Sequence, residues 1–245
     1  MELKLANKTA LITGASKGIG LAVAEVFAAE GCHLHLAARN GEAMLRAKQD
    51  LETRHGVKVT IHALDLSGTA AMEKLAAEVG DIDILINNAG DIPAGSLEIL
   101  DDAAWRSGFD LKVFGYITLS RLYYPRMKGK DGVILNIIGN SGENWDASYI
   151  AGSTGNAALM SFTKALGGAS LNHGVRVVAV NPGPVATDRM LKIMKRRPST
   201  CSATRAAGKS CSTNIRASVR PRQRKSPISS PSCPRPRPAT SPVPW

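Results

Sequence analysis

Near its N-terminus the chain reads Thr13-Gly14-Ala15-Ser16-Lys17-Gly18-Ile19-Gly20. An apolar run at 9–12, expected to be a strand, precedes this glycine-rich turn, and an expected helix at 21–29 follows it. In that context a glycine motif is typical of a dinucleotide site, with the pyrophosphate at the helix N-terminus. Gly14 permits the tight turn, Gly18 lets a pyrophosphate approach the backbone, and Gly20 lets helix and strand pack closely. The predicted contacts in this turn are Gly14, Ser16, Lys17, Gly18, Ile19 and Gly20.

The rest of the chain alternates between apolar runs of strand length and longer segments with helical periodicity. Strands are expected at 9–12, 33–39, 57–65, 82–86, 133–138 and 175–180, and helices at 21–29, 42–55, 68–79, 101–128 and 151–171. Strands that alternate with helices at this spacing indicate a parallel sheet. The sequence therefore predicts an α/β fold, a single Rossmann-type domain with a doubly wound parallel sheet.

Two further motifs follow expected strands. Asn87-Asn88-Ala89-Gly90 ends the fourth, and Asn181-Pro182-Gly183-Pro184-Val185-Ala186-Thr187 ends the sixth. Together with Thr-Gly-x3-Gly-Ile-Gly, these motifs resemble the short-chain dehydrogenase/reductase family over about residues 5 to 190. The resemblance implies further cofactor contacts from Asp65, Leu66, Asn88, Ala89, Gly90, Pro182, Gly183, Val185 and Thr187. Within that set, the pair at 65–66 is expected beside the adenine and Thr187 at the nicotinamide carboxamide.

Cofactor choice depends on the end of the second expected strand. NAD-preferring enzymes carry an acid there that holds the ribose 2′-hydroxyl. This chain instead has Ala38 and Arg39, and Lys17 adds a second cation in the glycine turn. Because a guanidinium suits phosphate geometry, the sequence favours NADP(H), with NAD(H) as the alternative.

The catalytic positions depart from the family pattern of Asn, Ser and a Tyr-x3-Lys pair. An ungapped alignment places Lys112, Gly139, Gly152 and Asn156 at those four positions. An alternative alignment puts Tyr149 at the tyrosine position but Ser153 at the lysine position. Either way, the chain is predicted to be a divergent member without the usual Tyr-x3-Lys pair.

Substitutes for the missing groups lie nearby in sequence. A phenol with an unperturbed pKa of about 10 needs a neighbouring cation to act as an acid–base group near neutral pH. We predict Tyr149 as proton donor, Lys112 as the cation and Ser141, or Asn140, as carbonyl donor. In the alternative interpretation, Tyr149 is an ordinary aromatic at a helix start and Lys112 a surface lysine.

Composition changes abruptly near residue 190. Residues 1–190 hold 18 basic and 20 acidic residues, a net charge of −2, whereas 191–245 hold 13 basic and no acidic residues. We predict a Rossmann domain at 1–190 and a disordered, basic Pro/Arg/Ser-rich tail at 191–245. Out-of-frame translation from about residues 195–199 is one hypothesis for the tail. An in-frame extension that binds an anionic partner is the other.

These features favour an oxidoreductase that moves hydride between NADP(H) and a small carbonyl or alcohol substrate. A nucleotide-binding pseudoenzyme and an anionic-partner binder acting through the tail are the alternatives, but binding to nucleic acid would rest on the tail alone. No apolar run reaches membrane-spanning length, no signal-peptide pattern begins the chain, and its 4 cysteines lack metal-like spacing. We expect a cytoplasmic protein without metal or membrane association. We expect a homodimer rather than a tetramer, formed by helices 101–128 and 151–171.

Overall fold

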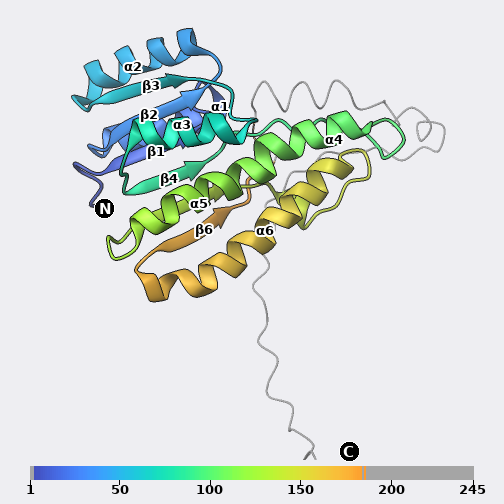
Figure 1. Ribbon diagram of the computed structural model, residues 1–245. Coiled ribbons are helices and arrows are strands. Elements are labelled where there is room, and N and C mark those ends of the chain that lie inside the picture. Colours follow the sequence, from blue (N-terminus) through green and yellow to red (C-terminus); the bar gives the residue numbers. More distant parts are fainter. Residues whose placement is uncertain (1–2, 184, 186–245) are drawn as a thin grey trace, which may run out of the picture. The chain divides into compact units, whose positions relative to one another are not determined.

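The computed structural model describes residues 3–183 and 185 (Figure 1). Its six parallel strands form one sheet in the order β3-β2-β1-β4-β5-β6. They are β1 (Thr9–Thr13), β2 (His33–Ala38), β3 (Val59–Ala63), β4 (Ile84–Asn87), β5 (Val133–Ile137) and β6 (Arg176–Val180). The order reverses between β1 and β4, which is where a doubly wound sheet opens a crevice for a ligand. The predicted fold class is confirmed, although β3 and β4 each begin two residues later than expected.

Helices cover both faces of the sheet. They are α1 (Gly18–Ala29), α2 (Gly41–His55), α3 (Thr69–Val79), α4 (Asp102–Phe109), α5 (Gly115–Met127) and α6 (Ile150–Ser170). On one face, Ala24 and Ala28 of α1 and Met44 of α2 pack against the even-numbered side chains of β1, β2 and β4. On the other face, α3 and α5 pack through Met72, Leu75 and Leu119, among others. Successive side chains of each strand point to opposite faces, and helices cover both, so both faces of the sheet are apolar, as in parallel sheets generally.

The single long helix expected at 101–128 is interrupted. Between α4 and α5, residues Asp110–Phe114 form the π-helical segment η1, in which Lys112 and Val113 are buried. Just before this segment the chain packs tightly, since a Cβ on Gly108 would lie 3.1 Å from the Cα of Ile92. Single π-helical turns inside α-helices occur frequently at functional sites. The expectation of one regular helix is therefore wrong, and the irregular turn brings Lys112 to the interior.

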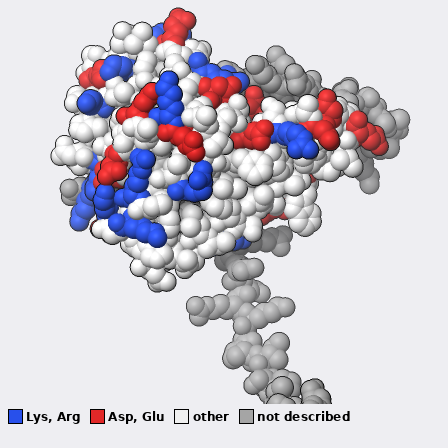
Figure 2. Space-filling model, viewed as in Figure 1, with Lys and Arg blue, Asp and Glu red and all other residues white. Residues whose placement is uncertain are grey.

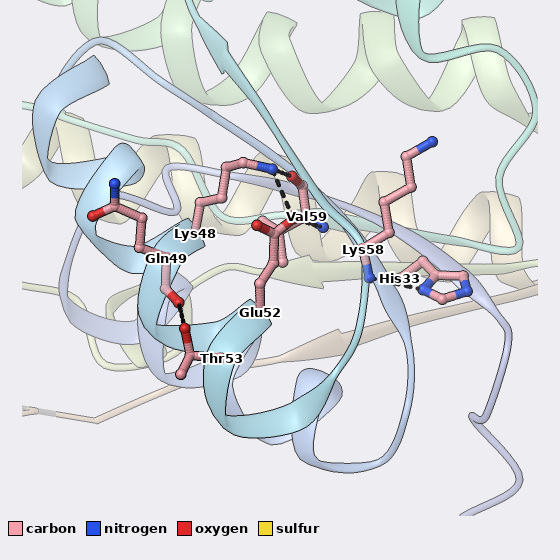
Figure 3. Close-up of polar contacts among 7 residues, drawn as sticks. All are labelled: His33, Lys48, Gln49, Glu52, Thr53, Lys58 and Val59. Atoms are coloured by element: carbon pink, nitrogen blue, oxygen red, sulfur yellow. Dashed lines mark hydrogen bonds and ion pairs between the residues drawn. The ribbon is translucent and has the colours of Figure 1, made fainter.

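Edge strand β3 is fastened by side chains of α2 (Figure 3). Lys48 Nζ donates to the carbonyl oxygen of Val59, and the Val59 amide donates to Glu52 Oε1 at 3.0 Å. The hydrogen bond from Lys48 to Glu52, at 2.7 Å, lowers the pKa of the Glu52 carboxyl. Just before β3, the Lys58 amide donates to Nδ1 of His33, the first residue of β2, at 3.1 Å. These contacts fix the strand that leads to Asp65 and Leu66.

The surface of the described part carries charges of both signs. Figure 2 shows Lys and Arg side chains interspersed with Asp and Glu on the face it displays. None of the helices in the described part of the chain is long and apolar enough to cross a membrane.

Candidate active site

The glycine-rich turn joins β1 to α1 at the carboxyl edge of the sheet. Gly14 and Gly18 have φ of +66° and +58°, a region that favours glycine. A Cβ on Gly20 would collide with the carbonyl oxygen of Gly14, so helix and turn approach too closely for any side chain there. Lys17 is the N-cap of α1, and the helix begins at Gly18. The turn therefore presents the backbone amides of a helix N-terminus beside a lysine, which suits a phosphate.

The end of β4 is joined to this turn by a compact set of hydrogen bonds. Thr13 Oγ1 accepts from the amides of Asn88 and Ala89 at 2.9 and 3.0 Å. Asn88 Nδ2 donates to the carbonyl oxygens of Thr13 and Gly14 at 3.0 and 3.2 Å. Deeper in the sheet, Asn87 Nδ2 donates to Asn136 Oδ1 at 2.9 Å. The two asparagines thus rigidify the strand ends on both sides of the crevice.

The residues predicted to contact the adenosine half stand around the ends of β2 and β3. Arg39 is exposed and its Nη2 lies 4.0 Å from Asp91 Oδ2, so the guanidinium reaches across from β2 toward the segment after β4. Asp65 is exposed and accepts from the Ser67 amide at 3.0 Å, whereas Leu66 is buried. This edge therefore combines a cation at the surface with an apolar floor.

The segment after β6 closes the other side of the crevice. The carbonyl oxygen of Pro182 accepts from the Asn140 amide at 3.1 Å, which joins the exits of β5 and β6. Gly183 and Val185 are exposed. The predicted contact Thr187 and the whole tail at 191–245 lie outside the described residues.

Lys112 is a buried lysine rather than a surface one. Its side chain is nearly inaccessible, and its Nζ donates to the carbonyl oxygen of Ile138 at 2.5 Å. The stem passes Gly90, where a Cβ would lie 2.8 Å from Lys112 Cδ. The interpretation of Lys112 as a surface cation is therefore wrong. The ammonium lies at the carboxyl end of β5, next to the loop that carries Ser141.

Ser141 is held by a residue to which the sequence assigned no role. Asn156 of α6 is buried, and its Nδ2 donates to Ser141 Oγ at 2.6 Å. The carboxamide lies against Gly139, which has φ of +140°. Asn156 follows Tyr149 by seven residues, so helical spacing was the signal that places both on one face of α6.

Tyr149 is the N-cap of α6, one turn before Gly152. Its ring occupies the space into which a Cβ on Gly152 would project. An isolated bridge between Gly95 and Tyr149 ties the backbone of this residue to the loop after β4. Tyr149, Gly152 and Asn156 are spaced i, i+3 and i+7, so the phenol ring lies on the face of α6 that also carries the partner of Ser141.

A Tyr-x3-Lys spacing does occur elsewhere, at Tyr124 and Lys128. The ammonium of Lys128 lies 5.3 Å from the Tyr124 ring, and Tyr124 Oη hydrogen-bonds with His173 Nδ1 at 2.7 Å. Both residues belong to the end of α5 and the connection into β5, at the amino edge of the sheet. This pair is therefore at the opposite edge from the glycine turn.

Two other chemistries find no support in the described residues. No group of three or more His, Cys, Asp or Glu side chains in residues 3–183 could hold a metal ion. Cys32 is buried, and burial raises the pKa of its thiol to about 12. A thiol in that state is not a nucleophile near neutral pH.

A family model described as short chain dehydrogenase matches residues 8–198. The chain belongs to this family. It is 33% identical over 196 residues to a 3-oxoacyl-(acyl-carrier-protein) reductase of Chlamydia muridarum, covering 77% of this chain and 78% of that one. Both the predicted family and the oxidoreductase class are thereby confirmed.

Solved structures of proteins similar to this chain also have this fold. L-sorbose reductase from Gluconobacter frateurii, complexed with NADPH and L-sorbose, superposes with a TM-score of 0.72 at 32% identity, over 77% of this chain and 73% of that one. A NAD+-bound xylitol dehydrogenase shares the fold at 24% identity, with a TM-score of 0.71, over 78% and 75% of the two chains. The NADPH complex supports the predicted preference of this short-chain dehydrogenase for NADP(H). These relatives lend no support to the pseudoenzyme alternative.

Proposed function

We propose that this short-chain dehydrogenase moves hydride between the nicotinamide of NADP(H) and a small carbonyl or alcohol substrate. The glycine turn supplies the phosphate site, and Arg39 together with Lys17 supplies the positive charge for a 2′-phosphate. The segment 88–90 borders the cofactor on one side of the crevice, and Pro182, Gly183 and Val185 border it on the other. In reduction, bound NADPH would supply hydride to the carbonyl carbon, and residues of this chain would supply a proton to the carbonyl oxygen.

The observation that carries the catalytic proposal is the position of the Tyr149 ring over Gly152. In that place the phenol lies on the face of α6 that also carries Asn156, the hydrogen-bond partner of Ser141. A general acid must lie within hydrogen-bond reach of the substrate oxygen. We assign the proton to Tyr149 Oη, a hydrogen bond to the carbonyl oxygen to Ser141, and stabilisation of the resulting phenolate to the ammonium of Lys112. When alcohol is oxidised, the same groups act in reverse.

Replacing Tyr149 by Phe tests this assignment. A panel of carbonyls with NADPH, and of alcohols with NADP+, first identifies a substrate. We then expect Tyr149→Phe to lower turnover by at least about 100-fold, the upper part of the usual range for general acid catalysis. NADPH binding, followed by the fluorescence of the reduced nicotinamide, should stay unchanged because the phenol does not hold the cofactor.

Tyr124→Phe is the matched control. It removes the same hydroxyl at the opposite edge of the sheet, where Tyr124 pairs with His173, and should leave turnover intact. Full turnover in Tyr149→Phe would show that the proton comes from another group. Failure of the unmodified protein to turn over any carbonyl or alcohol would favour the nucleotide-binding pseudoenzyme.

We further propose a homodimer, built by α5 and α6, in the cytoplasm. The exposed side chains of α6 include Thr154, Ala158, Ser161 and Lys164. Light scattering of the full chain tests this proposal, and a stable tetramer would contradict it. Binding of an anionic partner by the tail would weaken steeply with salt and disappear when residues 198–245 are removed.

A further inference from the structure

Asn156 places a polar carboxamide at a buried position, where an unpaired polar group lowers stability. Its side chain is 3% exposed, on the face of α6 turned toward the exit of β5. The neighbouring Gly139 leaves just enough room, because a Cβ there would lie 3.0 Å from Asn156 Nδ2. Gly139 also has φ of +140°, which an L side chain rarely adopts. The backbone after β5 is thus shaped to admit this carboxamide.

The carboxamide is only half satisfied. Its Nδ2 donates to Ser141 Oγ at 2.6 Å, while its Oδ1 is buried and has no hydrogen-bond partner within residues 3–183 and 185. Leaving a buried acceptor unpaired costs about 1–3 kcal/mol, so such a group in a folded protein calls for an explanation. Packing alone does not explain it, because an apolar side chain of the same size would avoid that cost.

The hydrogen bond to Ser141 offers an explanation. A serine hydroxyl has one hydrogen to donate and lone pairs to accept with. When Oγ accepts from the Asn156 amide, the hydroxyl hydrogen remains available for a different acceptor, and the O–H bond is polarised by the bond it accepts. Lys112 Nζ donates to the carbonyl oxygen of Ile138, three residues before Ser141, so the start of this loop is held as well. The hydrogen bond from Asn156 restricts the direction of the Ser141 O–H.

We propose that Asn156 is a positioning residue that directs the Ser141 hydroxyl toward the carbonyl oxygen of the substrate. Asn156 does not touch the substrate itself, and it acts only through the hydrogen bond into Ser141 Oγ. This inference rests on the proposed function, because it requires that Ser141 donates to the reacting oxygen.

Asn156→Asp tests the direction of this hydrogen bond. An ionised carboxylate accepts hydrogen bonds but cannot donate them, so it would draw the hydroxyl hydrogen of Ser141 away from the substrate. We expect kcat in Asn156→Asp to fall at least 30-fold at alkaline pH and to recover as the carboxyl is protonated and donates to Oγ again. Asn156→Leu, of similar volume, should lose activity by a constant factor relative to the unmodified protein at every pH.

A double-mutant cycle separates this role from a structural one. In a Ser141→Ala background, Asn156→Asp should cause no further loss, and its extra pH dependence should vanish. NADPH fluorescence confirms that each variant still folds and binds cofactor. If Asn156→Asp keeps the turnover of the unmodified protein at alkaline pH, the positioning role of Asn156 is wrong, while the proposed function still stands. Full turnover in Ser141→Ala, or no turnover in the unmodified protein, would overturn the proposed function as well.

Discussion

At the scale of single residues, three glycines each make room for one polar side chain of the candidate site. Gly90 lies against the stem of Lys112, Gly139 against the carboxamide of Asn156, and Gly152 against the ring of Tyr149. The sequence showed glycines at 139 and 152 where the family has Ser and Tyr. It did not show that neighbouring side chains occupy the vacated space, because that depends on contacts between separate segments.

Gly152→Ala should disturb the site through the Tyr149 ring. The added Cβ would collide with that ring, and overpacking costs about 1–3 kcal/mol of unfolding free energy. We expect turnover to fall about 10-fold or more as the phenol is displaced. Gly168→Ala is the control in the same helix, because nothing lies within 4 Å of its Cβ. It should raise stability by about 0.5–1 kcal/mol without changing turnover. Denaturant unfolding and steady-state kinetics measure both effects, and equal behaviour of the two variants would contradict the assigned contact.

Arg39→Asp should reverse cofactor preference. The substitution exchanges a phosphate partner for a repelling carboxylate, next to Asp91, while leaving the pyrophosphate site at the glycine turn unchanged. We expect the dissociation constant for NADPH to rise at least 30-fold and that for NADH to change less than about 3-fold, since each 1.4 kcal/mol corresponds to a factor of 10. Titration of nicotinamide fluorescence gives both constants. Equal weakening for the two cofactors would show that Arg39 does not contact the 2′-phosphate.

At the scale of elements, hydrophobic patterns predicted every strand and most helix bounds to within two residues. They succeeded because a parallel sheet buries both faces, so each strand is a short apolar run. They failed at 110–114, where the π-helical turn has the same residue types as an ordinary helix. The close approach of Gly108 to Ile92 and the burial of Lys112 both depend on tertiary contacts, which residue types alone do not reveal.

Lys112→Met tests what this turn contributes. The apolar stem is largely kept, but the carbonyl of Ile138 loses its donor, which costs about 1–3 kcal/mol of unfolding free energy. Because we propose Lys112 as the cation that stabilises the phenolate, its loss should lower turnover at least 10-fold and move the pH optimum upward. Thermal unfolding and a pH–rate profile separate the two effects. Lys74→Met, at an exposed position on α3, should change neither. An unshifted optimum would remove Lys112 from the proton-transfer machinery.

At the scale of the whole molecule, the cofactor half and the catalytic half of the proposed site differ in how well the sequence alone predicts them. The proposed cofactor half consists of contiguous motifs that would bind through their backbone, so residue spacing was enough to propose it. The proposed catalytic residues come from η1, the exit of β5 and the start of α6, and only the fold can bring such separate segments together. The histidines illustrate the same limit. His35 of β2 and His62 of β3 are 27 residues apart in sequence, yet they share a hydrogen bond of 3.0 Å because the two strands are neighbours.

This histidine pair should make folding stability depend on pH. Burial, reinforced by His62 and Lys58, lowers the pKa of His35 to about 4, against about 6.5 in an unfolded chain. Above pH 6.5 both states are neutral. As pH falls below 6.5 the unfolded chain takes up a proton that the folded protein does not, so stability decreases until about pH 4. At about 1.4 kcal/mol per unit of pKa, the loss is at most about 3.5 kcal/mol.

Denaturant unfolding between pH 7.5 and pH 4.5, a range above most carboxylate titrations, measures this loss. His35→Gln keeps a side chain that can hydrogen-bond with His62 but does not titrate, so the slope of stability against pH should flatten. His173→Gln is the control, because His173 is exposed and pairs with Tyr124 away from the sheet core. The predicted slope comes from the partial burial of His35 beside His62. An equally steep slope in His35→Gln would assign the acid sensitivity to other groups.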